Sequence, residues 1–342
     1  MKDTTVSVDV AKSVFEIAVS LRPGSVAETH RLSRARFSTF FAARKPTTVV
    51  MEACGTAHHW GRELERQGHR VVLLPPHAIR PYVPRNKTDR TDAKGILEAF
   101  RNEEIHPVPV KSVAQQTLAT LHRLRSRWMA TRTSRINTVR GVLREFGIAI
   151  SLGSRRVIPA VRLALEDADS GLPYAIRPAL AEVCAEIRDL EARIALIERQ
   201  LEALAREIPV VSLLRSVPGI GLLTATALVA IVGDAVRFLS GRHLASFIGL
   251  TPRESSTGLR RRLGAISKRG DAYVRMLLIH GARSVLCHAK KVGTHDRLRA
   301  WALDREQHRG HNKAAVALAN KLARIAWAVW TKGVPYQSAP AV

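Results

Sequence analysis

Four carboxylates in the first hundred residues could together hold metal ions. Asp9 lies near the end of an apolar run typical of a β-strand, and Glu52 ends another such run. Asp89 and Asp92 stand three residues apart at the start of a helical pattern, so they share one face of that helix. Mg²⁺ prefers carboxylate oxygens, and two such ions can polarise a phosphodiester. The four acids together predict a site for Mg²⁺ or Mn²⁺.

Each acid also has a purely structural interpretation. Asp9 could end its strand at a turn, and Glu52 could be a surface or helix-capping acid. Asp89 and Asp92 could stabilise a helix N-terminus through the helix dipole. The metal site is favoured because the four acids occur together, at strand ends and a helix start, in a strongly basic protein.

A second segment that could carry chemistry is the SSTG sequence at 255–258, which a run of cations follows. A hydroxyl beside a glycine on a loop can approach a phosphorus atom, and cations can neutralise the charge that develops. The alternative is a turn before a phosphate-binding loop, with no covalent role. Composition does not choose among Ser255, Ser256 and Thr257 as the nucleophile. The cations are Arg260, Arg261, Arg262, Lys268 and Arg269.

The sequence PGIG at 218–221 is typical of a helix–hairpin–helix turn. Gly219 and Gly221 would leave backbone N–H groups exposed at a helix start, where they can bind a DNA phosphate without reading the base sequence. An ordinary helical turn is the alternative.

The elements that must position the acids form an α/β domain over 1–110. Because strand ends can meet over one edge of a sheet, Asp9 and Glu52 are expected to lie near each other. The predicted strands are 4–10, 14–20, 47–52 and 69–76, and the predicted helices are 34–45, 57–68 and 90–103.

Two long helices are predicted over 111–208. In the first, 112–147, an apolar stripe leaves much of the surface to arginines, which favours a helix that follows a phosphate backbone over a merely solvated basic face. Its candidate contacts are Arg123, Arg127 and Arg135. The second, 176–207, carries a heptad seam, which predicts a two-helix hairpin or an intermolecular coiled coil. Residues 151–175 read as a connector.

A mostly helical domain is predicted over 209–334, and residues 335–342 are predicted to form a tail.

The whole chain has 54 Lys and Arg against 29 Asp and Glu, a net charge of +25, which favours a nucleic-acid-binding protein over a merely basic one. The three cysteines form no CxxC pair, so the sequence supports neither a zinc knuckle nor a disulfide framework. Without a signal-peptide layout or an apolar run of membrane-spanning length, we expect a cytoplasmic, nucleoid-associated protein and no membrane partner.

Several motifs in order resemble the DEDD-type transposases of bacterial insertion sequences, a family described as bridge-RNA-guided serine recombinases. In the first domain they are VSVDVAKSVFEIAV, VVMEACGTAHHW and KTDRTDAKGILEA. In the last domain they are VPGIGLLTATAL, ASFIGLTPRESSTG and LGAISKRGDAYVRMLLIHGAR. The resemblance covers nearly the whole chain. Where the family often has Gly-Gly-Lys, this chain has Gly258, Leu259 and Arg260.

The resemblance implies a ribonuclease-H-like or RuvC-like first domain whose DEDD acids, Asp9, Glu52, Asp89 and Asp92, bind Mg²⁺. It implies that Ser256 attacks DNA and forms a 5′-phosphoserine, and that a structured noncoding RNA pairs with donor and target DNA. It also implies assembly into a dimer or tetramer through the coiled coil. The alternatives are a RuvC-like nuclease or junction resolvase that activates water, and a non-catalytic scaffold that binds nucleic acid.

Overall fold

The structure is a computed structural model that describes residues 4–22, 25–83, 89–292 and 296–340, with the side chains at 89, 90 and 292 outside the description. The chain divides into two compact units, Met1–Ala114 and Gln115–Val342. Each unit has its own hydrophobic core, so each is described by itself.

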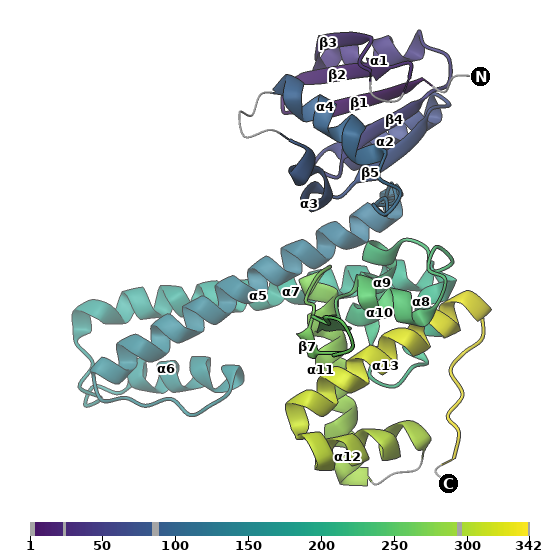
Figure 1. Cartoon of the computed structure of the whole chain (residues 1–342). Helices are drawn as coiled ribbons and strands as arrows, with labels where there is room; N and C mark the ends of the chain where they lie inside the picture. The colour runs from purple at the N-terminus through teal and green to yellow at the C-terminus, as the bar shows by residue number, and fades with distance from the viewer. Residues whose placement is uncertain (1–3, 23–24, 84–88, 293–295, 341–342) are drawn as a thin grey trace. The chain divides into compact units, whose positions relative to one another are not determined.

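The first unit is built on a five-stranded mixed sheet with the strand order β3-β2-β1-β4-β5 (Figure 1). The first three strands pair antiparallel, while β4 and β5 run parallel to β1. The mixed α/β architecture predicted for this region is therefore confirmed. The strands are β1 (Thr5–Val10), β2 (Val14–Ser20), β3 (Glu28–Ser33), β4 (Thr48–Glu52) and β5 (Arg70–Leu74).

The edge strand β3 was not predicted from the sequence. Its residues, ETHRLS, are mostly polar and none is buried, so they lack the apolar run that marks the other strands. Pairing with β2 along six residue positions determines its conformation. An edge strand needs only one partner, so polar residues are tolerated there.

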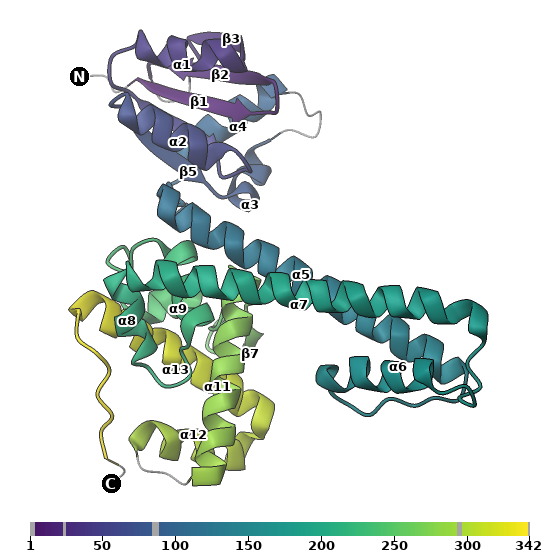
Figure 2. The same cartoon turned by 180° about the vertical axis from the view of Figure 1, so that it is seen from behind.

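Helices cover both faces of this sheet. Val6 and Val8 pack with Phe37 and Trp60 on the face covered by α1 and α2, which Figure 2 shows from behind. On the opposite face Val50 packs against Ile96 of α4, which lies across the sheet in Figure 1. The helices are α1 (Arg34–Ala42), α2 (Ala57–Arg66), α3 (Pro76–Ile79) and α4 (Asp89–Phe100), with a short turn η1 (Arg80–Tyr82).

In the second unit two long helices, α5 (Val113–Glu145) and α7 (Arg177–Arg206), lie side by side and antiparallel (Figures 1 and 2). The heptad seam of α7 is buried within this one chain: Ile187 packs with Ile136 of α5, and Ile197 with Leu118. The sequence left open a hairpin or an intermolecular coiled coil, and the structure forms the hairpin.

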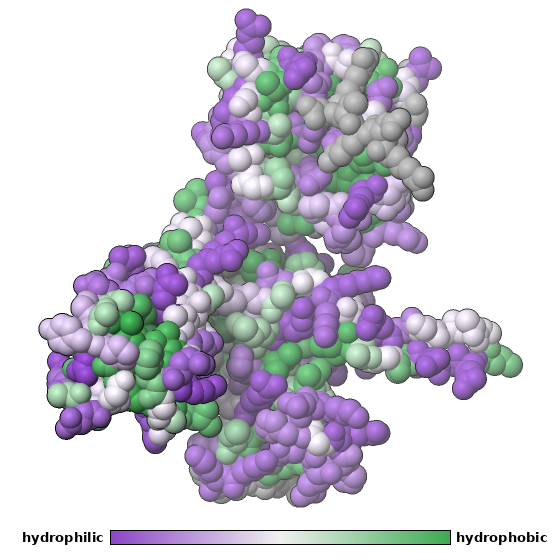
Figure 3. Space-filling model, turned by 90° about the vertical axis from the view of Figure 1, so that its left-hand side faces the viewer, coloured by the Kyte–Doolittle hydropathy of each residue, from purple (hydrophilic) through white to green (hydrophobic). Residues whose placement is uncertain are grey.

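The segment between the long helices was expected to be a plain connector, yet it contains η2 (Ser154–Arg156), α6 (Val157–Glu166) and η3 (Tyr174–Ile176). Val157 and Val161 of α6 are buried against the two long helices. Figure 3 faces this end of the hairpin and shows hydrophobic surface there. Leu152 and Tyr174, which flank α6 in the sequence, have exposed fractions of 90% and 87%.

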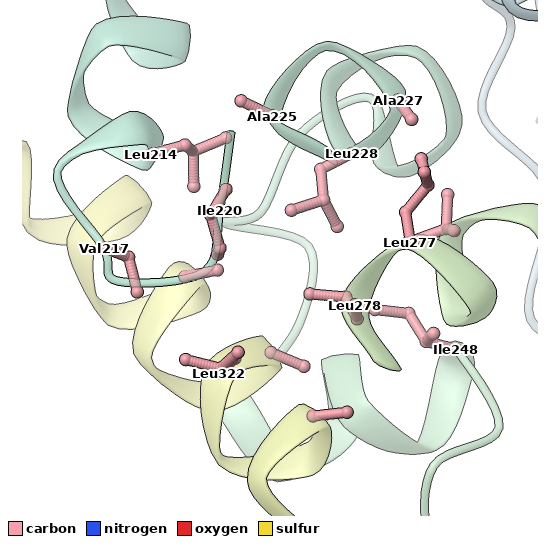
Figure 4. Packing of buried hydrophobic residues seen from close by; sticks show 14 of the residues in the cluster. Leu214, Val217, Ile220, Ala225, Ala227, Leu228, Ile248, Leu277, Leu278 and Leu322 are labelled. Carbon is pink, nitrogen blue, oxygen red and sulfur yellow. The ribbon is translucent and has the colours of Figure 1, made fainter. Parts of the chain in front are cut away.

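The rest of the second unit is mostly helical, as predicted, and its helices pack around one core. Leu214, Leu228, Leu278 and Leu322 meet in this core from four different helices (Figure 4). A small hairpin of β6 (Pro252–Glu254) and β7 (Leu263–Ile266) interrupts it. The helices are α8 (Pro209–Arg215), α9 (Leu222–Val232), α10 (Gly241–Phe247), α11 (Ala272–Val292), α12 (Arg297–Arg309) and α13 (His311–Lys332). No helix in the described ranges is both long and apolar enough to cross a membrane.

Two glycines allow α11 to approach the turn between α8 and α9. A Cβ placed on Gly281 would lie well inside van der Waals contact with the backbone oxygen of Gly219. Gly219 itself has φ +82°, a conformation that favours glycine. Backbone packs directly against backbone here, so neither residue has room for a side chain.

We expect Gly281→Ala to lower the free energy of unfolding by about 1–3 kcal/mol, because the new methyl group forces backbone apart in a packed core. The matched control is Gly141→Ala, on the exposed surface of α5, where nothing lies within 4 Å of the new Cβ. That change should instead stabilise by about 0.5–1 kcal/mol, since alanine favours helix. Urea denaturation followed by circular dichroism measures both, and equal effects would contradict the proposed contact.

Candidate functional site

Asp9 and Glu52 lie at matching positions on neighbouring parallel strands. Val8 of β1 is opposite Met51 of β4, and each acid is the next residue along its strand. Side chains at matching positions of parallel strands emerge on the same face of a sheet. Both acids therefore share the face of the sheet that α4 covers, the face to which Ser7 and Val50 also contribute.

The start of α4 is attached to this same face. The hydroxyl of Ser7 donates a hydrogen bond of 2.6 Å to the backbone oxygen of Ala93, and Ala93 packs against Ala18 of β2. Asp92 directly precedes Ala93, and its Oδ1 atom is buried. The backbone of Asp89 begins α4, but its side chain lies outside the described residues. The structure thus brings Asp9, Glu52 and the first turn of α4 to one sheet face.

The acids do not form a compact cluster among the described side chains. No group of three or more His, Cys, Asp and Glu close enough to hold a metal ion occurs where side chains are described, a search that did not include Asp89. The oxygen donors themselves are of the type that suits Mg²⁺ or Mn²⁺. The carboxylate oxygens of these acids are therefore chemically suited to a divalent cation.

Glu16 is an acid on this face that the sequence analysis missed. In the antiparallel pairing of β1 and β2 it is directly opposite Asp9. Its carboxylate is only 14% exposed and pairs with Arg31 at 3.3 Å. Like Asp9, it interrupts an otherwise apolar strand, and that shared pattern was the signal available in the sequence.

The serine segment forms the tip of the β6–β7 hairpin. Ser256 donates a hydrogen bond of 2.7 Å from Oγ to Oε1 of Glu254, and the backbone N–H of Arg262 donates to the same Oγ at 3.2 Å. Arg261 pairs with Glu254 at 3.2 Å. Within the described residues the side chains of Ser255 and Thr257 have no such partners, so the hairpin orients one hydroxyl of the three candidates.

Backbone contacts hold the base of this hairpin. Gly249 and Gly270 both have positive φ, and a Cβ on either would run into backbone of the neighbouring segment. Ser267 donates from its N–H to Thr251 at 2.8 Å, and Lys268 donates to Gly249 at 3.1 Å. The base is therefore well fixed, whereas the side chains at the tip are exposed.

A buried polar network ties the start of α11, just after the hairpin, to two other helices. His122 of α5 hydrogen-bonds the hydroxyl of Tyr273 at 3.1 Å and that of Thr226 at 2.9 Å. Burial lowers the pKa of His122 to about 4, so the ring is neutral at physiological pH. The pKa of Tyr273 is raised by burial. No sequence pattern indicates this network, because its members come from three separate helices.

The arginines of α5 fall into two groups. Arg125, Arg132 and Arg135 pair with glutamates of α7, at distances of 2.7, 3.4 and 2.6 Å. Arg135, one of the predicted phosphate contacts, therefore already has Glu186 as a partner, and this hydrogen bond raises its pKa. Arg123 and Arg127 are exposed and form no ion pair with any described residue. They remain the candidates for phosphate binding on this helix.

The cations after the serine segment are exposed, and so is Gly221 of the PGIG turn. Arg260, Arg262, Lys268 and Arg269 form no ion pair in the described part of the chain. Gly221 precedes the first residue of α9, whereas Gly219 is packed against α11. Of the two glycines predicted to bind a backbone phosphate, Gly221 has its surface open to solvent.

Comparison with known proteins gives consistent matches along the chain. The family model described as "Transposase IS116/IS110/IS902 family" matches residues 211–297, and a DEDD-type IS110 model described as "Transposase" matches 6–148. A probable family 20 transposase of Pseudomonas aeruginosa is 42% identical, covering 98% of this chain and 99% of that protein. The transposase for insertion sequence element IS1111A of Coxiella burnetii is 38% identical, over 98% and 92%. The transposase for insertion sequence element IS1328 of Yersinia enterocolitica is 34% identical, over 97% and 98%.

We expect Arg127→Gln to weaken binding to a DNA duplex and to reduce the slope of log affinity against log salt by about 1, because one phosphate contact is lost. Arg135→Gln is the matched control on the same helix. It should change the slope by less than half as much, since Glu186 already neutralises that guanidinium. Fluorescence anisotropy over a salt series measures both. Equal losses would show that the ion pair opens when DNA binds.

Proposed function

The chain belongs to the IS110/IS116 family of insertion-sequence transposases, enzymes that cleave and join DNA, and within this activity we propose that Ser256 forms a covalent phosphoserine with the DNA strand. The hydrogen bonds of the Ser256 hydroxyl support this residue over its neighbours. Glu254 and the backbone N–H of Arg262 orient this hydroxyl at the exposed tip of the hairpin. Cations on the same hairpin would bind the phosphate.

In this proposal Oγ of Ser256 attacks the phosphorus of a DNA phosphodiester and displaces the 3′ oxygen. The broken strand ends in a free 3′ hydroxyl, and its 5′ phosphate is esterified to Ser256. Because the ester retains the energy of the original bond, another 3′ hydroxyl can attack it and restore a phosphodiester without ATP. Exposed cations such as Arg260 and Arg262 would stabilise the charge that develops on the phosphate.

We propose that Asp9, Glu52, Asp89 and Asp92 bind Mg²⁺ or Mn²⁺, in a first unit of ribonuclease-H-like or RuvC-like type. The matching positions of Asp9 and Glu52 on β1 and β4, and the attachment of α4 to their sheet face, support this assignment. A divalent cation at this site would polarise the scissile phosphodiester. The carboxylates supply its ligands and otherwise repel the phosphate, so DNA approaches them only when cations are bound.

We further propose that a structured noncoding RNA guides the enzyme to donor and target DNA, at the nucleoid. The net charge of +25 supports binding to more than one polyanion. We also propose that copies assemble into a dimer or tetramer. The heptad seam is already buried within one chain, so the exposed apolar residues at the end of the α5–α7 hairpin, including Leu152, Leu163 and Tyr174, are better suited to this contact.

Ser256→Ala is expected to abolish a covalent protein–DNA adduct, because the substituted residue has no oxygen to bond phosphorus. The adduct is measured as labelled DNA that stays with the protein under denaturing electrophoresis. Ser255→Ala is the matched control and should leave the adduct intact, since the Ser255 side chain has no hydrogen-bond partner among the described residues. If Ser256→Ala still cleaves DNA at the normal rate and no adduct forms with the unsubstituted protein, the enzyme is a metal-dependent nuclease instead.

Asp9→Asn is expected to weaken Mn²⁺ binding by at least about tenfold and to abolish DNA cleavage, because a neutral amide replaces a charged ligand. Titration calorimetry on the protein without DNA measures the affinity. Glu98→Gln is the matched control, since it removes an exposed carboxylate from α4 that pairs with Arg101. Unchanged Mn²⁺ binding in Asp9→Asn would remove this acid from the metal site, and intact cleavage would favour the non-catalytic scaffold.

A further inference from the structure

The hydroxyl of Ser256 is already in contact with a group that can take its proton. Glu254 is the last residue of β6, and its Oε1 lies 2.7 Å from Oγ of Ser256. A carboxylate at that distance from a hydroxyl is within the range of a general base. Nothing in the family match or in the proposed phosphoserine requires an acid at this position, so the contact calls for an explanation of its own.

We propose that Glu254 is the general base of DNA cleavage, accepting the proton of Ser256 as Oγ attacks phosphorus. This assignment rests on the proposed phosphoserine chemistry. As the bond between Oγ and phosphorus forms, the bond between phosphorus and the 3′ oxygen breaks. The proton of Ser256 moves to Oε1 of Glu254, and the departing 3′ oxygen takes a proton from water. In the rejoining step the attacking 3′ hydroxyl gives its proton to water, and Oγ takes a proton through Glu254 as that atom leaves phosphorus.

The hydrogen bonds of Ser256 leave its oxygen ready for this step. The hydroxyl proton is donated to Glu254, and one lone pair accepts the N–H of Arg262 at 3.2 Å. The second lone pair remains for phosphorus. Because both partners belong to the same hairpin, the hydroxyl rotor is fixed before DNA binds, which reduces the entropy cost of reaching the attacking geometry.

Arg261 is a second partner of the proposed base. Its guanidinium pairs with the same Oε1 that Ser256 contacts, at 3.2 Å. The hydrogen bond from Ser256 and the nearby Arg261 lower the pKa of Glu254 below its ordinary value, so the carboxylate is ionised at neutral pH. A phosphate bound by Arg261 would draw this cation from Glu254, and loss of the cation would make the carboxylate a stronger base when the substrate is in place.

The alternative is that Glu254 only stabilises the hairpin. Glu254→Gln separates the two roles, because the amide oxygen can still accept the hydrogen bond of Ser256 but is not a base. We expect this variant to form the covalent adduct about 10²–10⁴-fold more slowly at pH 7, with an affinity for DNA no lower than that of the unsubstituted protein, because Arg261 is released from its ion pair. Glu182→Gln, an exposed carboxylate on α7, is the matched control and should react at the normal rate.

The pH dependence of adduct formation is the decisive measurement. With Glu254 ionised throughout, the rate from single-turnover reactions should be flat between pH 6 and 9. In Glu254→Gln hydroxide must remove the proton, so the rate should rise by up to about tenfold per pH unit and approach the unsubstituted rate. A defect in hairpin structure would instead lower the rate equally at every pH. Glu254→Asp, which retains a carboxylate, should recover part of the rate with a flat profile.

The outcomes separate this inference from the proposed function. If Ser256→Ala loses the adduct but Glu254→Gln forms it at the normal rate, or is slowed equally at all pH values, Glu254 is not the base and the phosphoserine stands. If the unsubstituted protein cleaves DNA without forming an adduct, the phosphoserine fails, and the role of Glu254 fails with it.

Discussion

The parallel pairing of β1 with β4 is the constraint on which the first unit depends. It brings residues more than forty positions apart to the same level of one sheet, so Asp9 and Glu52 reach the same face together. A slip of one residue would turn one of them to the opposite, apolar face, where Val8 and Met51 are buried. Burial of the apolar face therefore determines the register of β1 against β4, and this register places both acids on the opposite face.

A comparable division of roles holds in the second unit. Backbone contacts at Gly249 and Gly270 fix the base of the β6–β7 hairpin, and the contact between Gly219 and Gly281 fixes the turn before α9. These contacts use glycine because no side chain fits between the two backbones. The Ser256 hydroxyl, for which we propose the attack on DNA, and the neighbouring cations lie beyond this rigid base, in solvent, where a nucleic acid can reach them without displacing the core. The backbone contacts at the base of the hairpin thus stabilise this segment, while its exposed tip carries the groups proposed to react.

The sequence predicted those parts of the fold whose periodicity is local. Apolar runs identified four of the five strands in the sheet of the first unit, and heptads identified the long helix α7. The polar strand β3 and the short helix α6 were not predicted, because strand pairing and tertiary packing determine them and their composition does not. For the same reason the sequence could not show that Arg135 pairs with Glu186, because that contact depends on which residues meet after folding. Glu254 and Ser256 are only two residues apart, but the polar sequence around them does not indicate the short strand β6 that brings their side chains together.

Ion pairs between α5 and α7 neutralise some of the positive charge of the protein. A part of the positive charge of α5 is used to hold α7, through three interhelical pairs that run along the hairpin. Each pair is partly exposed, so it contributes modestly to stability, but together they favour one antiparallel alignment of the two helices over others. Arginines outside the pairs, such as Arg123 and Arg127, keep their full charge in solvent. Because repulsion among such unpaired cations opposes compaction, a bound polyanion relieves it, and nucleic acid should stabilise the fold as well as serve as substrate.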